Sequence, residues 1–461
     1  MMLFGHHLRR MTVFLCLLEA AIFVAAFFAV ARGLPLANFN PASVGEVFQV
    51  AVVPTVLLFL AMVALGTYNI DVLQSPGTVT QRLVAVAVLG GIATLVLAAL
   101  GICDLISARQ MVLAEAAAFP LILVGRLSVR YLTAVPVLRS RALVLGTGPS
   151  ARRVWEALSG DNLGRLYRFV AIDAGASDHP EVPAARTMSR PESIADFALR
   201  NNIDQVVVAL DNQPDAMPMA DLVECRRRGI KVEDTSAFIE RETGKVDLDG
   251  LGAGWLVFDK GFELGPLGQL LKRGLDVAVS GALLILFAPV LLATALLIKL
   301  DSPGPVFYRQ TRVGLNGKPY SILKFRSMVQ DAEKDGKAQW AKSGDARVTR
   351  VGAIIRKTRV DEIPQAINVL KGDMSFVGPR PERPVFVDQL AAEIPYYNER
   401  HRVKPGITGW AQISYPYGAS VEDAREKLKY DLYYIKHQSF LFDLVIILQT
   451  VRIVLFAEGA R

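Results

Sequence analysis

The stretch LKRGLDVAVSGALLILFAPVLLATALLIKL (residues 271–300) determines how the C-terminal part of this chain meets a membrane. Its uncharged core runs for 22 residues, from Val277 to Ile298, which is long enough to span a bilayer. Basic residues, which mark the cytosolic side, flank it at both ends: Lys272, Arg273 and Lys299. Pro289, near its middle, removes a backbone hydrogen bond. A helix–break–helix hairpin explains both features, and a kinked spanning helix stays open as the alternative.

Four further apolar runs predict an N-terminal bundle of four transmembrane helices. They are Met11–Ala31, Val47–Gly66, Leu83–Ile102 and Met111–Val124. Hydrophobic residues make up 52% of the chain, which agrees with a membrane component. Basic residues precede the first run and follow the fourth, and none lies in the loop 33–46, so both ends of the bundle are expected in the cytosol. A signal peptide is the alternative for the first run, but its apolar core is too long.

Composition narrows the class of protein further. The three cysteines, Cys16, Cys103 and Cys225, form no C-x-x-C pair, so neither a disulfide framework nor a zinc site is expected. The formal charge of +7 is modest for 461 residues. We expect no nucleic-acid partner.

Residues 136–262 alternate between short apolar runs and helical patterns, which predicts a cytosolic α/β domain with a parallel sheet. The expected strands are RALVLGTG, RFVAIDA, QVVVAL and IKVED. The helix after the second strand is expected to begin with a capping box from Ser189 to Glu192. The turn GTGPSA is similar to a dinucleotide-binding turn, with Asp173 near the place of the ribose-binding acid. A structural or regulatory domain explains this crowded turn better than a working cofactor site.

Basic residues gather shortly after the hairpin: Arg309, Arg312, Lys318, Lys324 and Arg326. Aromatic residues lie between them. At a membrane surface such a cluster could simply bind anionic lipid headgroups, at ~1 kcal/mol per residue. The alternative is a pocket for a diphosphate and a phosphorylated lipid. Our candidates for that pocket are Arg309, Arg312, Lys324 and Arg326.

The segment TRVDEIPQ (358–365) places two acids, Asp361 and Glu362, shortly before Pro364. Proline is tolerated only in the first turn of a helix, so Asp361 is predicted to be the N-cap and Glu362 the first helical residue. An apolar stripe and a glycine complete this helix: Ile363, Ile367, Leu370 and Gly372. A capping pair explains the two acids without chemistry. An ionised Asp at a helix N-terminus can also attack phosphorus, while its neighbour, pointing ~100° away, holds Mg²⁺.

The segment GDMSFVGPRPE (372–382) holds a further candidate, Arg380, between Pro379 and Pro381. The prolines stiffen the backbone on both sides of the arginine. A guanidinium held in this way can bind a diphosphate through two hydrogen bonds or stack on a base. The alternative is an arginine that bonds neighbouring carbonyl groups in a proline-rich turn.

Two more segments complete the C-terminal part. RHRVKPGITGW (400–410) adds Arg400 and Arg402 to a loop rich in Gly and Pro, which is expected on the substrate side. FLFDLVIILQTVRIVLF (440–456) is too polar for a comfortable span. We expect it to lie on the membrane as an interfacial helix.

Four segments of the C-terminal part together resemble those of bacterial sugar transferases, the monotopic polyprenyl-phosphate phosphoglycosyl transferases. These segments are KFRSM, TRVDEIPQ, GDMSFVGPRPE and VKPGITGWAQ. The resemblance covers roughly 265–461, and the rest of the chain is similar to long members that start exopolysaccharide or O-antigen repeat units. It implies three parts. They are an N-terminal four-helix transmembrane bundle (1–135), an α/β Rossmann-like domain (136–262), and an α+β, mostly helical catalytic domain (263–461) with a re-entrant helix at about 271–300.

The resemblance also implies a two-step reaction at the cytosolic face of the bacterial inner membrane. Asp361 would attack the phosphorus that bears the sugar in a UDP-sugar, UMP would leave, and undecaprenyl phosphate would take the sugar phosphate. Glu362, together with Asp361, would hold Mg²⁺, and Arg380 would contact the nucleotide. The family's membrane segment is a hairpin, which places Pro289 at its break, although the family often has Ser-Pro where this chain has Ala288-Pro289.

Two other functions fit parts of the sequence. Asp247 and Asp249 form a D-x-D pair that could hold a metal in an ordinary glycosyltransferase, which would release UDP instead of UMP. A non-catalytic nucleotide sensor built on the middle domain would lose its function without residues 1–260. For the favoured transferase we expect glucose or galactose as the sugar. Its partners would be UDP-sugar, undecaprenyl phosphate, the lipid bilayer and further copies of the chain.

Overall fold

The computed structural model describes the chain in segments. They are residues 2–3, 6–7, 10–33, 55–68, 72, 75–99, 105–134, 140–159, 167–173, 181–183, 187–189, 191–211, 217–251, 264–330, 345, 347–416, 418 and 420–456. The chain forms two compact units. One contains Leu256–Arg461 with the short pieces Met1–Leu8 and Val63–Leu65, and the other contains Arg9–Met62 and Gly66–Trp255.

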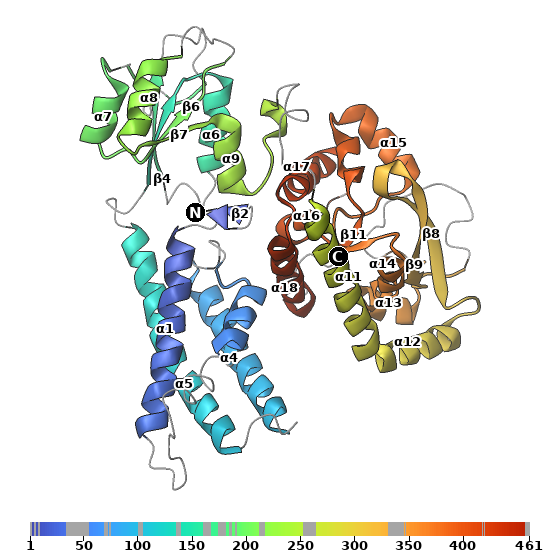
Figure 1. The fold of residues 1–461 in the computed structure, drawn as a ribbon. Helices are drawn as coiled ribbons and strands as arrows, with labels where there is room; N and C mark the ends of the chain where they lie inside the picture. The colour runs from blue at the N-terminus through green and yellow to red at the C-terminus, as the bar shows by residue number, and fades with distance from the viewer. Residues whose placement is uncertain are drawn as a thin grey trace. The chain divides into compact units, whose positions relative to one another are not determined.

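Long apolar helices form the N-terminal region (Figure 1). They are α1 (Arg10–Gly33), a helix at Thr55–Ala64, α4 (Pro76–Ala99) and α5 (Leu105–Ala134). Within the described segments, Pro76–Val96 and Met111–Ser128 are long and apolar enough to cross a membrane, and a bent helix pair near residue 287 would make a third span. The membrane component is therefore confirmed. The bundle of four complete spans stays a prediction, because much of the predicted second run lies outside the described residues.

A buried ion pair joins α1 to α5, and these two helices lie side by side (Figure 1). Arg126 donates from Nε to Oε1 of Glu19 at 2.6 Å and from Nη2 to Oε2 at 3.0 Å. The Tyr68 hydroxyl donates to the same carboxylate at 2.6 Å, and Thr67 accepts from the arginine through its carbonyl oxygen. Because both charges are paired and hydrogen-bonded, Arg126 interrupts the apolar run without ending the helix.

The middle region is a five-stranded parallel sheet with helices on both faces, so the predicted parallel sheet is confirmed. Its strands are β3 (Ser140–Leu145), β4 (Tyr167–Asp173), β5 (Thr187–Ser189), β6 (Gln205–Val208) and β7 (Lys231–Asp234), in the order β5-β4-β3-β6-β7. Helices α7 (Ile194–Arg200) and α8 (Met219–Arg227) pack on one face. Helices α6 (Pro149–Ser159) and α9 (Thr235–Thr243) pack on the other (Figure 1).

The start of α7 differs from the sequence prediction. Ser189 is the last residue of β5 and not a helix cap. The N-cap is Ser193, whose Oγ accepts a hydrogen bond from the Asp196 amide at 3.2 Å. The predicted capping box was therefore wrong, because the chain first completes the edge strand and turns through Pro191 before the helix begins.

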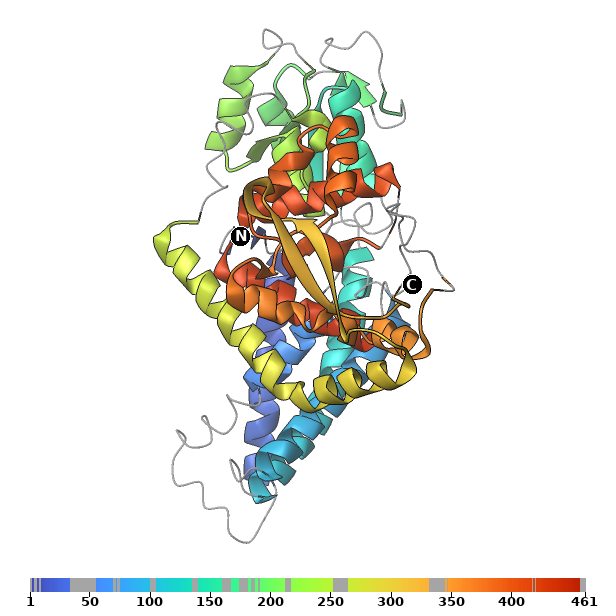
Figure 2. The same cartoon turned by 90° about the vertical axis from the view of Figure 1, so that its right-hand side faces the viewer.

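Between residues 264 and 456, the C-terminal unit combines helices with two small sheets. A bend of 62° separates α11 (Pro266–Leu286) from α12 (Ala288–Asp301), and Pro289 lies in the first turn of α12 (Figure 2). β8 (Phe307–Val313) and β9 (Pro319–Phe325) form an antiparallel hairpin, and β10 (Ser375–Val377) pairs with β11 (Gly406–Thr408) in parallel. The remaining helices are α13 (Arg350–Lys357), α14 (Gln365–Lys371), α15 (Pro384–Glu393), α16 (Trp410–Ser414), α17 (Val421–His437) and α18 (Phe440–Phe456). The bend fits a broken span or a hairpin, and the hairpin stays a prediction.

Polar side chains near the start of α11 fasten it to the rest of the unit. Lys272 pairs with Asp443 of α18 at 2.7 Å, and Asp276 accepts from the Phe376 amide at 2.8 Å. Arg273 donates to the last carbonyl oxygens of α14. Apolar side chains on this helix are left exposed: Leu267, Leu270, Ile285 and Leu286. The polar residues within 272–276 therefore fix the helix, which presents apolar surface both before and after them.

Candidate functional site

The two adjacent acids lie on a short 3-10 turn, Val360–Glu362, and not at the N-terminus of an α-helix. Arg359 enters this turn in the left-handed conformation, with φ 58°. Because this residue redirects the backbone, α14 begins only at Gln365, and the prediction that Asp361 caps a helix is wrong. The predicted end of the helix at Gly372 is confirmed, with φ 94°.

The buried face of α14 also differs from the prediction. Leu370 is 36% exposed, whereas Asn368 and Val369 are buried. The Asn368 side chain accepts from the Leu323 amide at 2.9 Å and donates to the Ser321 carbonyl oxygen at 2.8 Å, both on β9. These two hydrogen bonds set the rotation of the helix, so an amide faces the β8–β9 hairpin instead of the predicted apolar stripe.

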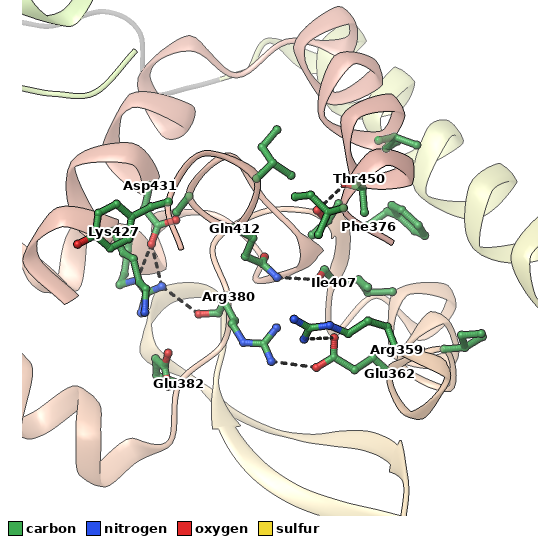
Figure 3. A pocket seen from close by; sticks show the side chains of 18 of the residues that line it. Arg359, Glu362, Phe376, Arg380, Glu382, Ile407, Gln412, Lys427, Asp431 and Thr450 are labelled. Carbon is green, nitrogen blue, oxygen red and sulfur yellow. Dashed lines mark hydrogen bonds and ion pairs between the residues drawn. The ribbon is translucent and has the colours of Figure 1, made fainter. Parts of the chain in front are cut away.

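Glu362 lies among three basic side chains. Its Oε1 accepts from Lys324 Nζ at 2.8 Å and from Arg380 Nη2 at 2.9 Å. Arg359 Nη1 approaches Oε2 at 3.9 Å, and Figure 3 shows both arginines directed at this carboxylate. Burial alone would raise the pKa of Glu362, but the positive charges of Arg380 and Lys324 hold it well below its ordinary value. Glu362 is therefore ionised and already engaged.

The neighbouring acid, Asp361, differs from Glu362 in its pKa and in its hydrogen bonding. The residue is only 9% exposed, and its Oδ1 has no hydrogen-bond partner among the described residues. Burial first, and the negative charge of Glu362 second, raise the pKa of Asp361 to about 6. At neutral pH this side chain is a largely ionised carboxylate with an unengaged oxygen. Because this oxygen is not engaged, Asp361 is the more nucleophilic of the two acids.

Arg380 is held by the close approach of two loops. The Gly378 amide donates to Thr408 at 2.9 Å and the Gly406 amide donates to the Pro379 carbonyl oxygen at 2.9 Å. A Cβ on Gly406 would lie 2.1 Å from the Gly378 nitrogen, so only glycine allows this approach. The loops carrying GPRP and KPGITGW therefore form one clamped platform.

A buried ion pair between Arg400 and Asp431 supports this platform. Arg400 donates to Asp431 of α17 at 2.8 Å, to the Tyr397 hydroxyl at 2.8 Å and to the carbonyl oxygen of Arg380 at 2.9 Å. Burial raises the pKa of Asp431 above its ordinary value, although the Arg400 charge opposes the shift. Arg400 therefore fixes the backbone of Arg380, whose side chain reaches Glu362.

The structure brings only some of the predicted substrate-binding residues together. Lys324 and Arg380 meet at Glu362. Arg312 donates to the carbonyl oxygen of Pro381 at 3.2 Å, so it supports the proline-rich segment from behind. Pro379 and Pro381 line a hollow of only ≈ 10 Å³ on that side.

Three other predicted residues lie away from this group. Arg326 is 5% exposed and donates to the carbonyl oxygens of Ser302 and Pro303, each at 2.8 Å, so it holds the turn after α12. Arg309 is exposed on β8. Arg402 is exposed and pairs with Glu399 at 3.4 Å. None of the three lines the cavity described next.

A cavity of ≈ 560 Å³ opens beside Glu362 (Figure 3). Three groups of residues line it, each with its own chemistry. The ion-pair wall consists of Arg359, Glu362 and Arg380. The polar wall consists of Tyr415, Ser420, Lys427 and Asp431. The apolar wall consists of Val279 and Leu283 on α11, the C-cap residue Phe287 that follows it, and Ile447, Val451 and Ile453 on α18. Asp361 does not itself line this space, although the residues on either side of it do.

Sequence reasoning missed several of these residues. Arg359 and Gln412 were inside recognised segments, but nothing marked their side chains as cavity-facing. Lys427 and Asp431 lie on α17, whose charged pattern is typical of a solvated helix. Tertiary packing of α17 against α16 and the 3-10 helix Tyr397–Arg402 brings this pair to the site.

The carboxylate pair fits a Mg²⁺ ion in part. Among the described residues, no three His, Cys, Asp or Glu side chains form a metal-binding group. Oδ1 of Asp361 is an unpartnered oxygen of the kind that Mg²⁺ prefers, and Glu362 offers a second carboxylate. Mg²⁺ commonly takes one or two carboxylates and completes its shell with substrate phosphates and water. The pair therefore fits an ion that arrives with a phosphorylated substrate.

The motifs behind the two rival functions are engaged inside the middle domain. Asp247 of the D-x-D pair accepts from Arg153 at 3.2 Å and from Ser236 at 3.3 Å, which links α6 to α9. At the GTGPSA turn, the Ser150 amide donates to Asp211 at 3.0 Å. A carboxylate of the protein thus lies at the helix N-terminus, where an anionic ligand would bind. Both contacts favour a structural role for these motifs.

These features define a membrane protein whose cavity combines a carboxylate pair, basic side chains and an apolar wall. The chain belongs to the bacterial sugar transferase family, whose sequence profile matches residues 267–457.

Three relatives show the range of the match. The UDP-glucose:undecaprenyl-phosphate glucose-1-phosphate transferase of Caulobacter vibrioides is 44% identical over 220 residues, which cover 44% of this chain and 82% of the relative. The UDP-N-acetylgalactosamine-undecaprenyl-phosphate N-acetylgalactosaminephosphotransferase of Aeromonas hydrophila is 48% identical over 241 residues, 52% of this chain and 56% of the relative. An exopolysaccharide production protein of Rhizobium leguminosarum is 45% identical over 191 residues, 40% of this chain and 94% of the relative. The chain thus spans about half the length of the Aeromonas relative.

Proposed function

We propose that this protein transfers a sugar 1-phosphate from a UDP-sugar to undecaprenyl phosphate, with release of UMP. The reaction would take place at the cytosolic face of the bacterial inner membrane and start an exopolysaccharide or O-antigen repeat unit. Family membership and the names of the relatives support the reaction class. The observation that carries the proposal is the contrast between two neighbouring acids: basic side chains hold Glu362, whereas Asp361 keeps an unengaged oxygen.

In the first step, a carboxylate oxygen of Asp361 attacks the phosphorus that carries the sugar. The bond from this phosphorus to the UMP oxygen breaks, and UMP leaves with the electron pair. The sugar phosphate remains on Asp361 as an acyl phosphate. Glu362 is a poorer nucleophile because Lys324 and Arg380 both donate to its Oε1 and their positive charges hold its electron density. Since Asp361 does not line the cavity, this step requires its side chain to turn toward it.

In the second step, a phosphate oxygen of undecaprenyl phosphate attacks the same phosphorus. The acyl phosphate bond breaks, the Asp361 carboxylate is restored, and the sugar leaves on a lipid diphosphate. Lys324, Arg359 and Arg380 are the groups that would exchange Glu362 for phosphate oxygens as substrate binds. Asp361 and Glu362 would hold Mg²⁺, which when bound would add positive charge beside the diphosphate.

The sugar is proposed only as a hexose. The relatives that we compared are named for both glucose and N-acetylgalactosamine. UDP-N-acetylgalactosamine must therefore be tested together with UDP-glucose and UDP-galactose, the donors that we expected. A panel of these three UDP-sugars covers the alternatives.

The test measures UMP release by Asp361→Asn and Glu362→Gln with this panel. We expect Asp361→Asn to lose on the order of 10⁴-fold or more in rate, because the nucleophile is gone. Glu362→Gln keeps the nucleophile and should lose less. Turnover by Asp361→Asn at the wild-type rate would remove Asp361 from the mechanism. Release of UDP instead of UMP would point to a glycosyltransferase.

A further inference from the structure

The apolar wall is built from matched stripes of two helices. On α11, Val279 and Leu283 lie four residues apart, so they share one face of the helix, and Phe287, the C-cap residue directly after the helix, continues this interval. On α18, Ile447 and Val451 have the same spacing. The two helices contact each other. The wall is therefore a feature of helix packing and not a chance gap between loops.

The apolar wall and the ion-pair wall line the same cavity. Among the described lining residues, α11 and α18 contribute no charged side chain. Thr450, the polar residue that α18 adds, is already hydrogen-bonded to Thr408 at 2.7 Å (Figure 3). A water-soluble nucleotide gains nothing from such a surface, whereas a hydrocarbon chain does.

The cavity also reaches the part of the unit suited to a membrane. Val451 lines it and is 44% exposed, so this residue lies at its rim. α11, which supplies the other stripe, leaves Ile285 79% exposed and Leu286 74% exposed. One helix thus presents leucine-rich surface to its surroundings and an apolar stripe to the cavity.

We propose that the apolar wall binds the isoprene units next to the phosphate of the acceptor lipid, with that phosphate at Arg359 and Arg380. This inference rests on the proposed transfer to undecaprenyl phosphate. A volume of ≈ 560 Å³ is typical of a small-molecule site and cannot enclose a long polyprenyl tail. The remainder of the tail would stay in the bilayer, and the polar wall would be left to the donor.

The test narrows the wall and measures each substrate separately. Leu283→Trp adds bulk inside the cavity, and Ile285→Trp, on the same helix but exposed to its surroundings, is the matched control. In detergent micelles we expect Leu283→Trp to raise the KM for undecaprenyl phosphate by about tenfold or more, since one misfitting group in an apolar pocket has effects of this size. The KM for UDP-sugar should stay unchanged, and the control should match the wild type for both substrates.

Equal increases in both KM values, or no change in either, would overturn the inference. If Leu283→Trp fails to fold, the wild-type protein is labelled with a photoreactive polyprenyl phosphate, and the labelled peptides must come from α11 and α18. Labelling confined to other segments would also overturn it. A wild-type protein that releases no UMP from any UDP-sugar would instead refute the proposed function, and the labelling experiment would still decide where the lipid binds.

Discussion

Asp361 and Glu362 are adjacent in the chain, yet their surroundings give them different properties. Three cations face Glu362, and its pKa lies well below the ordinary value. Asp361 is buried beside that negative charge, and its pKa is about 6. The sequence predicts that the pair is special but not which acid does what, because the assignment depends on Lys324 and Arg380, which reach Glu362 from other segments.

Replacing Asp361 by Asn is expected to stabilise the protein at neutral pH. Its pKa is raised from 3.8 to about 6 in the folded state, so ionised Asp361 opposes folding. This destabilisation is absent below about pH 4, develops as the pH rises toward 6, and reaches on the order of 3 kcal/mol above about pH 7. Thermal unfolding in metal-free detergent solution from pH 4 to pH 8 measures it. A variant that is no more stable than the wild type at pH 8 would contradict the assignment.

The Arg400–Asp431 pair should matter more for stability than an exposed arginine nearby. Arg400→Ala leaves Asp431 buried without its cation, which costs about 3–5 kcal/mol. Arg402→Ala, at an exposed position two residues further on, should change stability by less than ~0.5 kcal/mol. Denaturant unfolding of both variants gives the comparison. Equal effects would mean that the buried pair does not support the platform.

At the scale of elements, the clamped loops of β10 and β11 depend on glycine. A Cβ at Gly406 would lie 2.1 Å from a backbone nitrogen, so Gly406→Ala must part the two strands and displace Arg380. We expect a loss of stability of at least ~1–3 kcal/mol together with loss of UMP release. Gly274→Ala on α11 is the control, because nothing lies within 4 Å of the added atom and alanine favours a helix. Tolerance of both substitutions would argue against the clamp.

Sequence patterns predicted which helices and strands form better than which of their side chains are buried. The parallel sheet, the bend near Pro289 and the glycine stop of α14 follow from local rules of turn and helix chemistry. The predictions of a cap at Asp361 and of an apolar stripe on α14 were wrong. The left-handed backbone of Arg359 and the hydrogen bonds of Asn368 to β9 depend on tertiary contacts that the local sequence does not show. The polar residues of 440–456 predicted an interfacial helix, and one of them, Asp443, is 1% exposed and pairs with Lys272 of α11, 171 residues away in the chain.

At the scale of the whole molecule, the C-terminal unit carries every wall of the cavity. The apolar wall comes from the region of α11 and from α18, which are separated by most of the unit in the chain and share no local motif, and the polar wall lies on α17 and just before it. This is why the sequence predicted the basic end of the site but not the cavity. The family profile matches residues 267–457, which lie within the same unit.

A fragment of residues 256–461 is therefore expected to keep UMP-releasing activity in membranes. The Rhizobium relative, named for exopolysaccharide production, is matched over 94% of its length by 191 residues of this chain, so proteins of about this size exist among the relatives. UMP release by the fragment, compared with the full chain, measures this. A fragment that folds but is inactive would favour a function that depends on the middle domain.

The most direct test of the account is to look for the sugar phosphate on the protein itself. The full chain is incubated with UDP-sugar in the absence of undecaprenyl phosphate, quenched with acid and analysed by mass spectrometry. We predict a mass increase of one sugar phosphate on the peptide that contains Asp361, in step with the UMP released, and none in Asp361→Asn. UMP release without a modified protein, or a sugar phosphate on Glu362, would contradict the account.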